Sequence, residues 1–183
     1  MESLKVLVAE HRFILRLLGA LQRWAEDARR DRDTMQRELD RFVEVIEGFV
    51  DPIHHGKEEE ILFSTLVSEG FPSTHGPLPC MLAEHTRCRA YVAQLRRAAH
   101  APEAWDDLTL GGATTAALQY AELLTGHISK EDHMLYPMAQ RFLTPAMREE
   151  VDRRAAAFAE GPLQERALGL VALGERLIAE FGL

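Results

Sequence analysis

The segments HHGKEEEILF (residues 54–63) and HISKEDHMLY (residues 127–136) decide the fold of this chain, because both follow one pattern. Each reads His, two residues, Lys, Glu, a second acid, one residue, an apolar residue, Leu and an aromatic residue. On a helix the first and fifth positions of this pattern lie four residues apart and face the same side. Each segment therefore predicts a helix that presents a histidine and a glutamate together.

The tripeptide Ala-Glu-His is also duplicated, at residues 9–11 and 83–85. The two kinds of repeat recur at nearly equal intervals, since 85 − 11 = 74 and 127 − 54 = 73. The order along the chain is thus His, His-x-x-x-Glu, and then the same again. This order predicts two copies of one helical hairpin.

Apolar residues recur at helical spacing through almost all of the chain, and no stretch alternates long enough to predict a strand. The sequence predicts an all-α protein whose first four helices form an up-down-up-down four-helix bundle, because short connections make neighbouring helices antiparallel. We expect the bundle at residues 1–143 and extra C-terminal helices at 144–183, which pack on the bundle or form a homodimer surface. Pro52 and Pro137 fall inside the second and fourth helices and predict a bend in each. The expected helices are about 2–30, 33–69, 78–100, 110–142, 145–160 and 162–181.

Length, composition and charge limit the classes of function. With 183 residues, 46% of them hydrophobic, the chain is long enough for one buried core. The formal net charge of −8 argues against a nucleic-acid partner and against binding to anionic membranes. The N-terminal stretch MESLKVLVAEHRF lacks the layout of a signal peptide, so we expect a cytoplasmic protein.

The repeated motifs place histidines and glutamates on faces that also carry apolar residues one turn away, so we expect this polar layer inside the bundle. Unpaired carboxylates are costly to bury, and bound metal ions compensate for that cost. Six such side chains exceed what a tetrahedral zinc ion takes, so the sequence predicts two ions bridged by carboxylates. The mixture of imidazole and carboxylate suits iron, with manganese or zinc as alternatives. The candidate ligands are His11, His54, Glu58, His85, His127 and Glu131.

These motifs resemble those of the haemerythrin-like HHE cation-binding family over roughly residues 1–143. The resemblance is carried by HHGKEEEILF, by MLAEHTRCR at residues 81–89 and by HISKEDHMLYPMA at residues 127–139. It implies a four-helix bundle with a non-haem di-iron centre of the Fe–O–Fe type. It also implies that the six candidate ligands hold the two iron ions and that Glu58 and Glu131 bridge them.

Two alternatives remain open in this ligand set. His55 and Glu59 have the same spacing as His54 and Glu58, turned by about 100° around an ideal helix. We favour His54 because its register matches that of His127, and we therefore expect His55 to be dispensable for metal binding. Asp132 is the alternative to Glu131, which we favour because it repeats the spacing of the first segment.

The number of histidines bears on function. Oxygen-carrying haemerythrins have five histidine ligands, two of them one turn apart on the third helix, whereas the positions one turn from His85 are Met81 and Arg89 here. We therefore expect a four-histidine centre with about two coordination positions open to outside ligands. An open centre favours a protein that binds or reduces a small ligand, namely dioxygen, hydrogen peroxide or nitric oxide. The alternative is a non-enzymatic iron or oxygen sensor or carrier that binds a partner in a metal-dependent way.

Other charged and aromatic residues near the motifs are expected to have minor roles. Glu10 and Glu84 precede candidate ligands by one residue, so they are expected to point away from the site, toward solvent or a neighbouring helix. Lys57 and Lys130 are interpreted as surface charges. Tyr120 lies two turns before His127 on the same predicted face, where it is expected to be a core residue or to lie near the centre.

Overall fold

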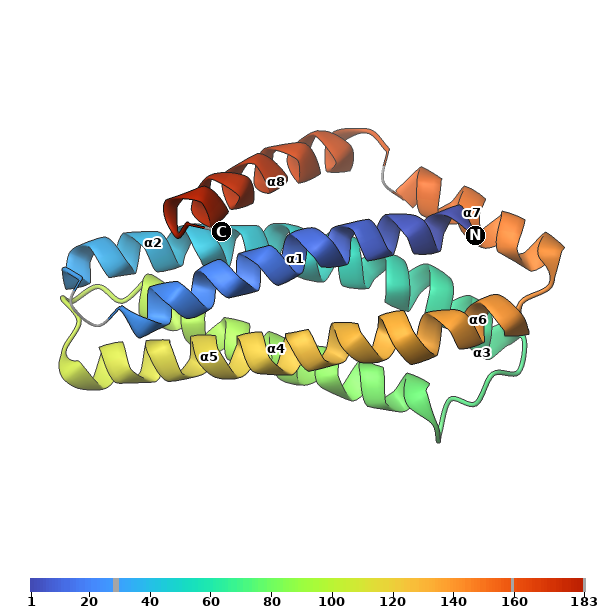
Figure 1. Cartoon of the computed structure of the whole chain (residues 1–183), viewed down its shortest axis with the longest axis horizontal. Coiled ribbons are helices and arrows are strands. Elements are labelled where there is room, and N and C mark those ends of the chain that lie inside the picture. The colour runs from blue at the N-terminus through green and yellow to red at the C-terminus, as the bar shows by residue number, and fades with distance from the viewer. Residues whose placement is uncertain (28–29, 159, 183) are drawn as a thin grey trace.

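The computed structural model describes residues 1–27, 30–158 and 160–182. Within these ranges the chain forms helices and no strand, which confirms the all-α prediction. Chain direction reverses at both ends of the molecule, as the coloured trace shows (Figure 1). The arrangement is consistent with an up-down-up-down bundle.

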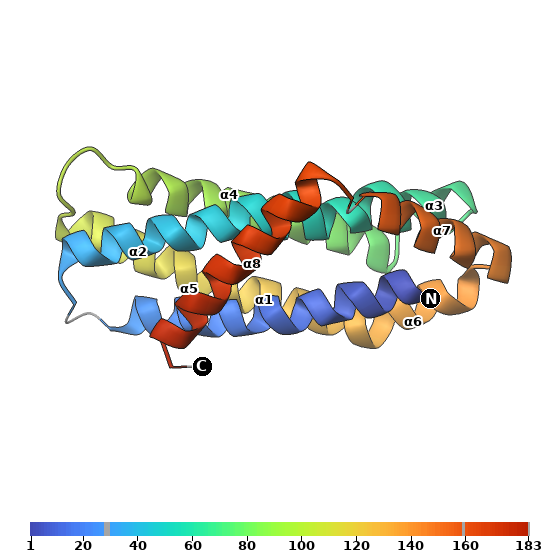
Figure 2. The same cartoon turned by 90° about the horizontal axis from the view of Figure 1, so that it is seen from above.

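The first four predicted helices are observed as long helical rods that lie along the long axis of the molecule (Figures 1 and 2). The first and third rods are α1 (Glu2–Glu26) and α4 (Pro77–Ala99). The second rod joins α2 (Arg32–Val45), η1 (Ile46–His55), η2 (Glu58–Phe63) and α3 (Ser64–Ser68) in one run of helical backbone. The fourth rod joins α5 (Asp107–Lys130), η3 (Glu131–Leu135) and α6 (Tyr136–Phe142) in the same way.

Aspartates fix the starts of two rods. Asp31 precedes α2 and accepts a hydrogen bond from the backbone N–H of Thr34. Asp106 does the same for α5 by accepting from the N–H of Thr109 at 2.7 Å. An N-cap of this kind satisfies a backbone donor that the helix leaves unpaired. The fourth rod consequently begins at residue 107, three residues before the predicted boundary.

The segments η1, η2 and η3 are π-helical, with hydrogen bonds from residue i to residue i−5. Pro52 lies within η1, where the ring lacks an N–H, and the next turn widens: Gly56 donates its N–H to the carbonyl of Asp51, five residues back. The backbone nevertheless continues through this point, as predicted for one long second helix. A wider turn changes the direction in which successive side chains point, and this matters at residues 54 and 55.

The core is divided into two apolar clusters that lie on opposite sides of a polar layer. The larger cluster includes Trp24, Phe42 and Leu124, each fully buried. The smaller one includes Leu66 and Leu135. The polar layer between them contains the histidines and glutamates of the repeated motifs, so it has apolar neighbours above and below.

The C-terminal helices α7 (Pro145–Phe158) and α8 (Pro162–Glu180) pack on the bundle, with α8 crossing the first two rods obliquely (Figure 2). The contact is close: a Cβ added to Gly48 of η1 would lie 2.7 Å from the side chain of Leu170. Ion pairs at the edge, between Arg41 and Glu180 at 2.7 Å, accompany this packing. No helix in the described part of the chain is long and apolar enough to cross a membrane.

Candidate metal centre

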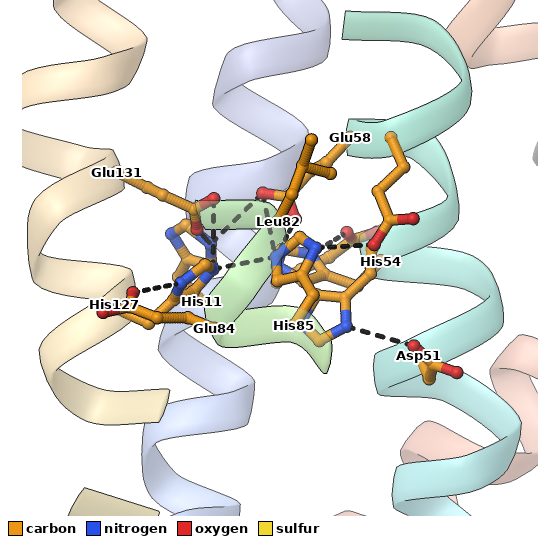
Figure 3. Close-up of polar contacts among 12 residues, drawn as sticks. His11, Asp51, His54, Glu58, Leu82, Glu84, His85, His127 and Glu131 are labelled. Carbon is orange, nitrogen blue, oxygen red and sulfur yellow. Dashed lines mark hydrogen bonds and ion pairs between the residues drawn. The ribbon is translucent and has the colours of Figure 1, made fainter. Parts of the chain in front are cut away.

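The structure brings all six predicted ligands together in the interior (Figure 3). It adds His55 to them. Their donor atoms form two groups, each with all atoms within 4.8 Å of one another. The first group contains His11, His54, Glu58 and Glu131, and the second contains His55, Glu58, His85 and His127. Every member is buried. Glu58 belongs to both groups, which is the position expected of a bridging carboxylate.

Glu131 also spans the two groups. Its Oε2 lies 3.4 Å from Nε2 of His11 in the first group, and its Oε1 lies 3.2 Å from Nε2 of His127 in the second. Glu58 is placed similarly, with Oε1 3.7 Å from Nε2 of His54 and Oε2 3.5 Å from Nε2 of His85. Each carboxylate therefore directs one oxygen toward each group.

His55 corrects the sequence analysis, which chose between His54 and His55 and expected only four histidines. Both imidazoles lie in the centre, one in each group, and both are 1% exposed. The choice assumed an ideal α-helix, in which neighbouring residues point about 100° apart. The π-helical turns of η1 and η2 change that spacing, so His54, His55 and Glu58 all face inward. The structure thus supplies a fifth histidine from the second rod rather than from the third.

The donor set fits a metal ion because several of its atoms have no other partner. Nε2 of His55, Oε2 of Glu58 and both carboxylate oxygens of Glu131 are buried and form no hydrogen bond among the described residues. Leaving such groups unpaired costs about 1–3 kcal/mol each, and more when they are charged. A cation bound within each group would pair with these atoms, whereas without metal they remain unpaired.

Each of the five histidines in the two donor groups uses the ring nitrogen that faces away from the centre, Nδ1, for a contact with a carboxylate. In each case Nδ1 lies within hydrogen-bonding distance of a carboxylate oxygen, which favours a proton on Nδ1 and a free lone pair on Nε2. The Nδ1 atom therefore acts as the donor and Nε2 faces the centre. The pairs are His11 with Asp132 (2.7 Å), His54 with Glu10 (3.0 Å), His55 with Asp51 (3.3 Å), His85 with Glu59 (2.7 Å) and His127 with Glu84 (3.0 Å).

Glu10 and Glu84 point away from the centre and toward a neighbouring helix, one of the two directions expected. Lys57 and Lys130 were expected to be surface charges, and their contacts correct that role. Glu10 accepts hydrogen bonds from both His54 and Lys57, and Glu84 from both His127 and Lys130. Lys57 is only 4% exposed. A residue beside a ligand turns away from its own helix face, but in a bundle that direction leads to the neighbouring helix.

The same pairing distinguishes Glu131 from Asp132. Asp132 bonds the outer nitrogen of His11, while Glu131 faces the centre with both oxygens. Glu59 takes the equivalent outer position beside His85. The charged residues shared by the two repeated segments therefore have the same roles in both. The His and the first acid face the centre, and the Lys and the second acid bond side chains of neighbouring helices.

Residues 2–139 match the protein family described as the Hemerythrin HHE cation binding domain. The chain belongs to this family. The match covers the first three helical rods, the fourth rod as far as residue 139 and every residue of the two donor groups, which confirms the family resemblance found in the sequence. No curated protein and no solved structure matches the chain.

Arg89 adds a further outer contact to this haemerythrin centre. Its guanidinium donates to Asp51 and to Glu59, each at 2.7 Å. Those two carboxylates hold Nδ1 of His55 and of His85. Arg89 thus fixes the two acids that orient imidazoles of the second group.

Tyr136 is a residue of the haemerythrin centre that was not predicted from the sequence, which indicated Tyr120 instead. Tyr120 is buried but hydrogen-bonds none of the donors among the described residues. The hydroxyl of Tyr136 donates to Oε1 of Glu58 and lies 3.4 Å from Nε2 of His11. The available signal was its place as the final aromatic of the repeated pattern, where the first copy has Phe63.

Burial controls the charges of the haemerythrin donors. Burial lowers the pKa of His54 to about 4 and that of His55 to about 3, so both imidazoles are neutral at neutral pH. Burial raises the pKa of Glu58 well above its usual range, and the nearby Glu131 raises it further. Burial also acts to raise the pKa of Glu131, but His11 and His127 outweigh this effect and hold it well below the usual range.

We expect metal-free protein to keep His54 and His55 unprotonated far below the ordinary histidine range. Because an unfolded histidine titrates near about 6.5, the unfolded chain takes up these protons first as the pH falls. Each histidine therefore contributes stability that is complete above about pH 6.5 and is lost as the pH falls toward its folded pKa. Nitrogen-15 NMR of chelator-treated protein at about pH 5 should show two neutral imidazoles, assigned with single substitutions. A titration of either ring near pH 6.5 would contradict the expected burial.

Proposed function

We propose that this protein is a non-haem di-iron protein that binds or reduces a small ligand, namely dioxygen, hydrogen peroxide or nitric oxide. The observation that carries the proposal is the pair of buried donor groups that share Glu58 and are both approached by Glu131. His11 and His54 would hold one ion, and His55, His85 and His127 the other. The imidazole and carboxylate donors suit iron in an Fe–O–Fe type centre, with manganese or zinc as alternatives.

The fifth histidine changes the expected number of open positions. Two six-coordinate ions offer about twelve positions, and five imidazoles, two bridging carboxylates and a bridging oxygen fill about eleven of them. About one position then remains, beside the ion with two imidazoles, instead of the two expected from four histidines. Bound iron would supply the electrons for ligand binding or reduction at that position.

The chain itself supplies orientation and exclusion of water. Five carboxylates hold the imidazoles in one tautomer, and the two apolar clusters separate the centre from solvent on both sides. Neutral His54 and His55 are ready to bind cations without first losing protons. All of the buried donors lie between residues 11 and 131, and they support metal binding. We place this metal-binding function in an up-down-up-down four-helix domain at residues 1–143.

The test begins with anaerobic iron loading and elemental analysis, followed by separate additions of dioxygen, peroxide and nitric oxide while the absorption spectrum is recorded. We expect about two iron ions per chain and a spectral change with at least one ligand. Protein loaded with zinc, which has no redox chemistry, is the control and should show no change. An iron-loaded protein that is silent toward all three ligands would overturn the proposal.

A specific contact favours a second candidate function, that of a non-enzymatic sensor or carrier. Helix α8 packs against η1, where Leu170 lies close to Gly48 in the segment that also carries His54 and His55. Metal or ligand occupancy at these histidines would therefore act on the segment beneath the C-terminal extension, residues 144–183. Catalytic turnover of peroxide favours the enzyme, whereas metal-dependent self-association through the extension without turnover favours the sensor.

On either proposal we expect a cytoplasmic protein without nucleic-acid or membrane partners.

A further inference from the structure

The two halves of the centre are related by an approximate internal symmetry that includes their aromatic residues. Phe63 and Tyr136 occupy the last position of the repeated segments. The ring of Phe63 stacks on His85, with centroids 6.0 Å apart and planes at 18°. The ring of Tyr136 stacks on His11, with centroids 5.5 Å apart and planes at 5°. The two aromatic residues are thus structural equivalents that differ by one hydroxyl group.

That hydroxyl lies among the donors of the first group. Tyr136 is 3% exposed, and its Oη donates to Oε1 of Glu58 and lies 3.4 Å from Nε2 of His11. Both of these atoms belong to the group that contains His54 and Glu131. The spacing is that of neighbouring ligands on one metal ion, because donors about 2.0–2.2 Å from an ion lie roughly 3 Å from one another.

A second departure from the symmetry concerns the other group. The residue after the first histidine is His55 in one repeat and Ile128 in the other. His55 is a donor of the second group, whereas Ile128 packs in the apolar core. The second group therefore gains an imidazole that the first lacks, and the first gains a phenol that the second lacks. Each half has one donor more than the shared motif provides.

We propose that Tyr136 is a protein ligand, bound through Oη to the ion held by His11 and His54. This inference rests on the di-iron function proposed above. Binding breaks the O–H bond and releases its proton to solvent as the oxygen–metal bond forms, and no electron is transferred. The phenolate oxygen takes the position that five histidines and two carboxylates leave open, so Tyr136 closes the centre to outside ligands until it is displaced.

A surface pocket leads to this tyrosine. It has a volume of about 830 Å³ and is lined by Tyr136 and Asp132 together with the cationic side chains of Lys5, Arg12, Arg141 and Arg148. Positive charge at the mouth of a pocket favours the approach of small anions, even in a chain whose net charge is −8. The pocket wall includes Tyr136 but no member of the two donor groups.

The test compares the wild type with Tyr136→Phe, which copies Phe63 of the other half. The matched control is Tyr120→Phe, which removes the hydroxyl of a buried tyrosine outside the donor groups. Each protein is loaded with iron and oxidised with ferricyanide, and resonance Raman spectra are excited in the visible range. We expect the ring vibrations of an iron-bound phenolate in the wild type and in Tyr120→Phe, and their complete loss in Tyr136→Phe.

Azide binding gives a second readout, because azide needs an open position on the metal. If Tyr136 keeps the wild-type site closed about nine-tenths of the time, Tyr136→Phe should bind azide about tenfold more tightly.

A third experiment does not depend on the folding of the Tyr136→Phe variant. The chain has three tyrosines, so Tyr91→Phe combined with Tyr120→Phe leaves Tyr136 alone, and we expect the phenolate vibrations to persist.

Two outcomes would overturn the ligand role. One is iron uptake without phenolate vibrations in the double variant, and the other is equal azide affinity in the wild type and Tyr136→Phe. Both would leave the di-iron function standing. Failure of the wild type to take up iron would instead overturn the proposed function and this ligand together.

Discussion

Glu58→Gln should lower the stability of the iron-loaded protein by about 4 kcal/mol, which corresponds to a fall in Tm of about 8–16 °C for a chain of this size. The estimate applies when free iron exceeds the wild-type Kd by about a thousandfold, since a ligand that binds only the folded state stabilises it by mass action. Glu58 belongs to both donor groups, so replacing it should weaken the binding of both ions at once. Iron content should fall with Tm.

The metal-free form should respond differently. Burial raises the pKa of Glu58 well above its usual range and so favours the protonated side chain in the metal-free protein, which glutamine matches in size and charge. Its oxygen can still accept the hydrogen bond from Tyr136. We therefore expect the stabilities of the two metal-free proteins to differ by less than about 1.5 kcal/mol, as is usual for volume-conserving replacements.

Calorimetry of chelator-treated and iron-loaded samples measures both effects. Glu60→Gln is the matched control, because Glu60 is exposed on the same rod and belongs to neither donor group. It should leave Tm and iron content unchanged. An equal loss of stability in the metal-free and iron-loaded forms of Glu58→Gln would show that Glu58 has only a structural role.

His55→Ile should reduce the iron content from about two ions per chain to about one. The substitution copies Ile128, the equivalent residue of the other repeat, and removes one of the three imidazoles of the second group. The expectation from the sequence was the opposite, because His55 had been assigned no role. The first group keeps His11, His54 and both carboxylates, so one ion should remain.

The variant should still fold without metal. Nε2 of His55 has no hydrogen-bond partner among the described residues, and replacing an unpaired buried acceptor by an apolar group removes a cost of about 1–3 kcal/mol. Asp51, which loses its contact with His55, keeps its ion pair with Arg89 at 2.7 Å. Elemental analysis gives the stoichiometry and circular dichroism checks the fold. His75→Ala, at an exposed loop position, should keep both ions, and two ions retained in His55→Ile would exclude His55 as a ligand.

The sequence by itself was sufficient for the helices and for most of the centre. Apolar periodicity placed each helical rod to within a few residues, and the duplicated His-x-x-x-Glu spacing identified six side chains that do meet in the interior. Such inferences succeed because they depend on one helix at a time. The distance between residues four apart on a helix is set by local backbone geometry, and a buried face is marked by its apolar neighbours.

Only the tertiary structure decided the roles of His55, Tyr136 and the outer carboxylates. His55 turns inward because η1 and η2 are π-helical, and hydrogen bonds to the fifth residue alter the angle that an ideal α-helix would impose. Tyr136 reaches Glu58, and Glu10 reaches His54, across helix interfaces. The residues that meet there depend on the rotation and separation of packed helices. Those quantities arise from the fit of many side chains in the core, and the spacing of residues along a single helix contains no information about them.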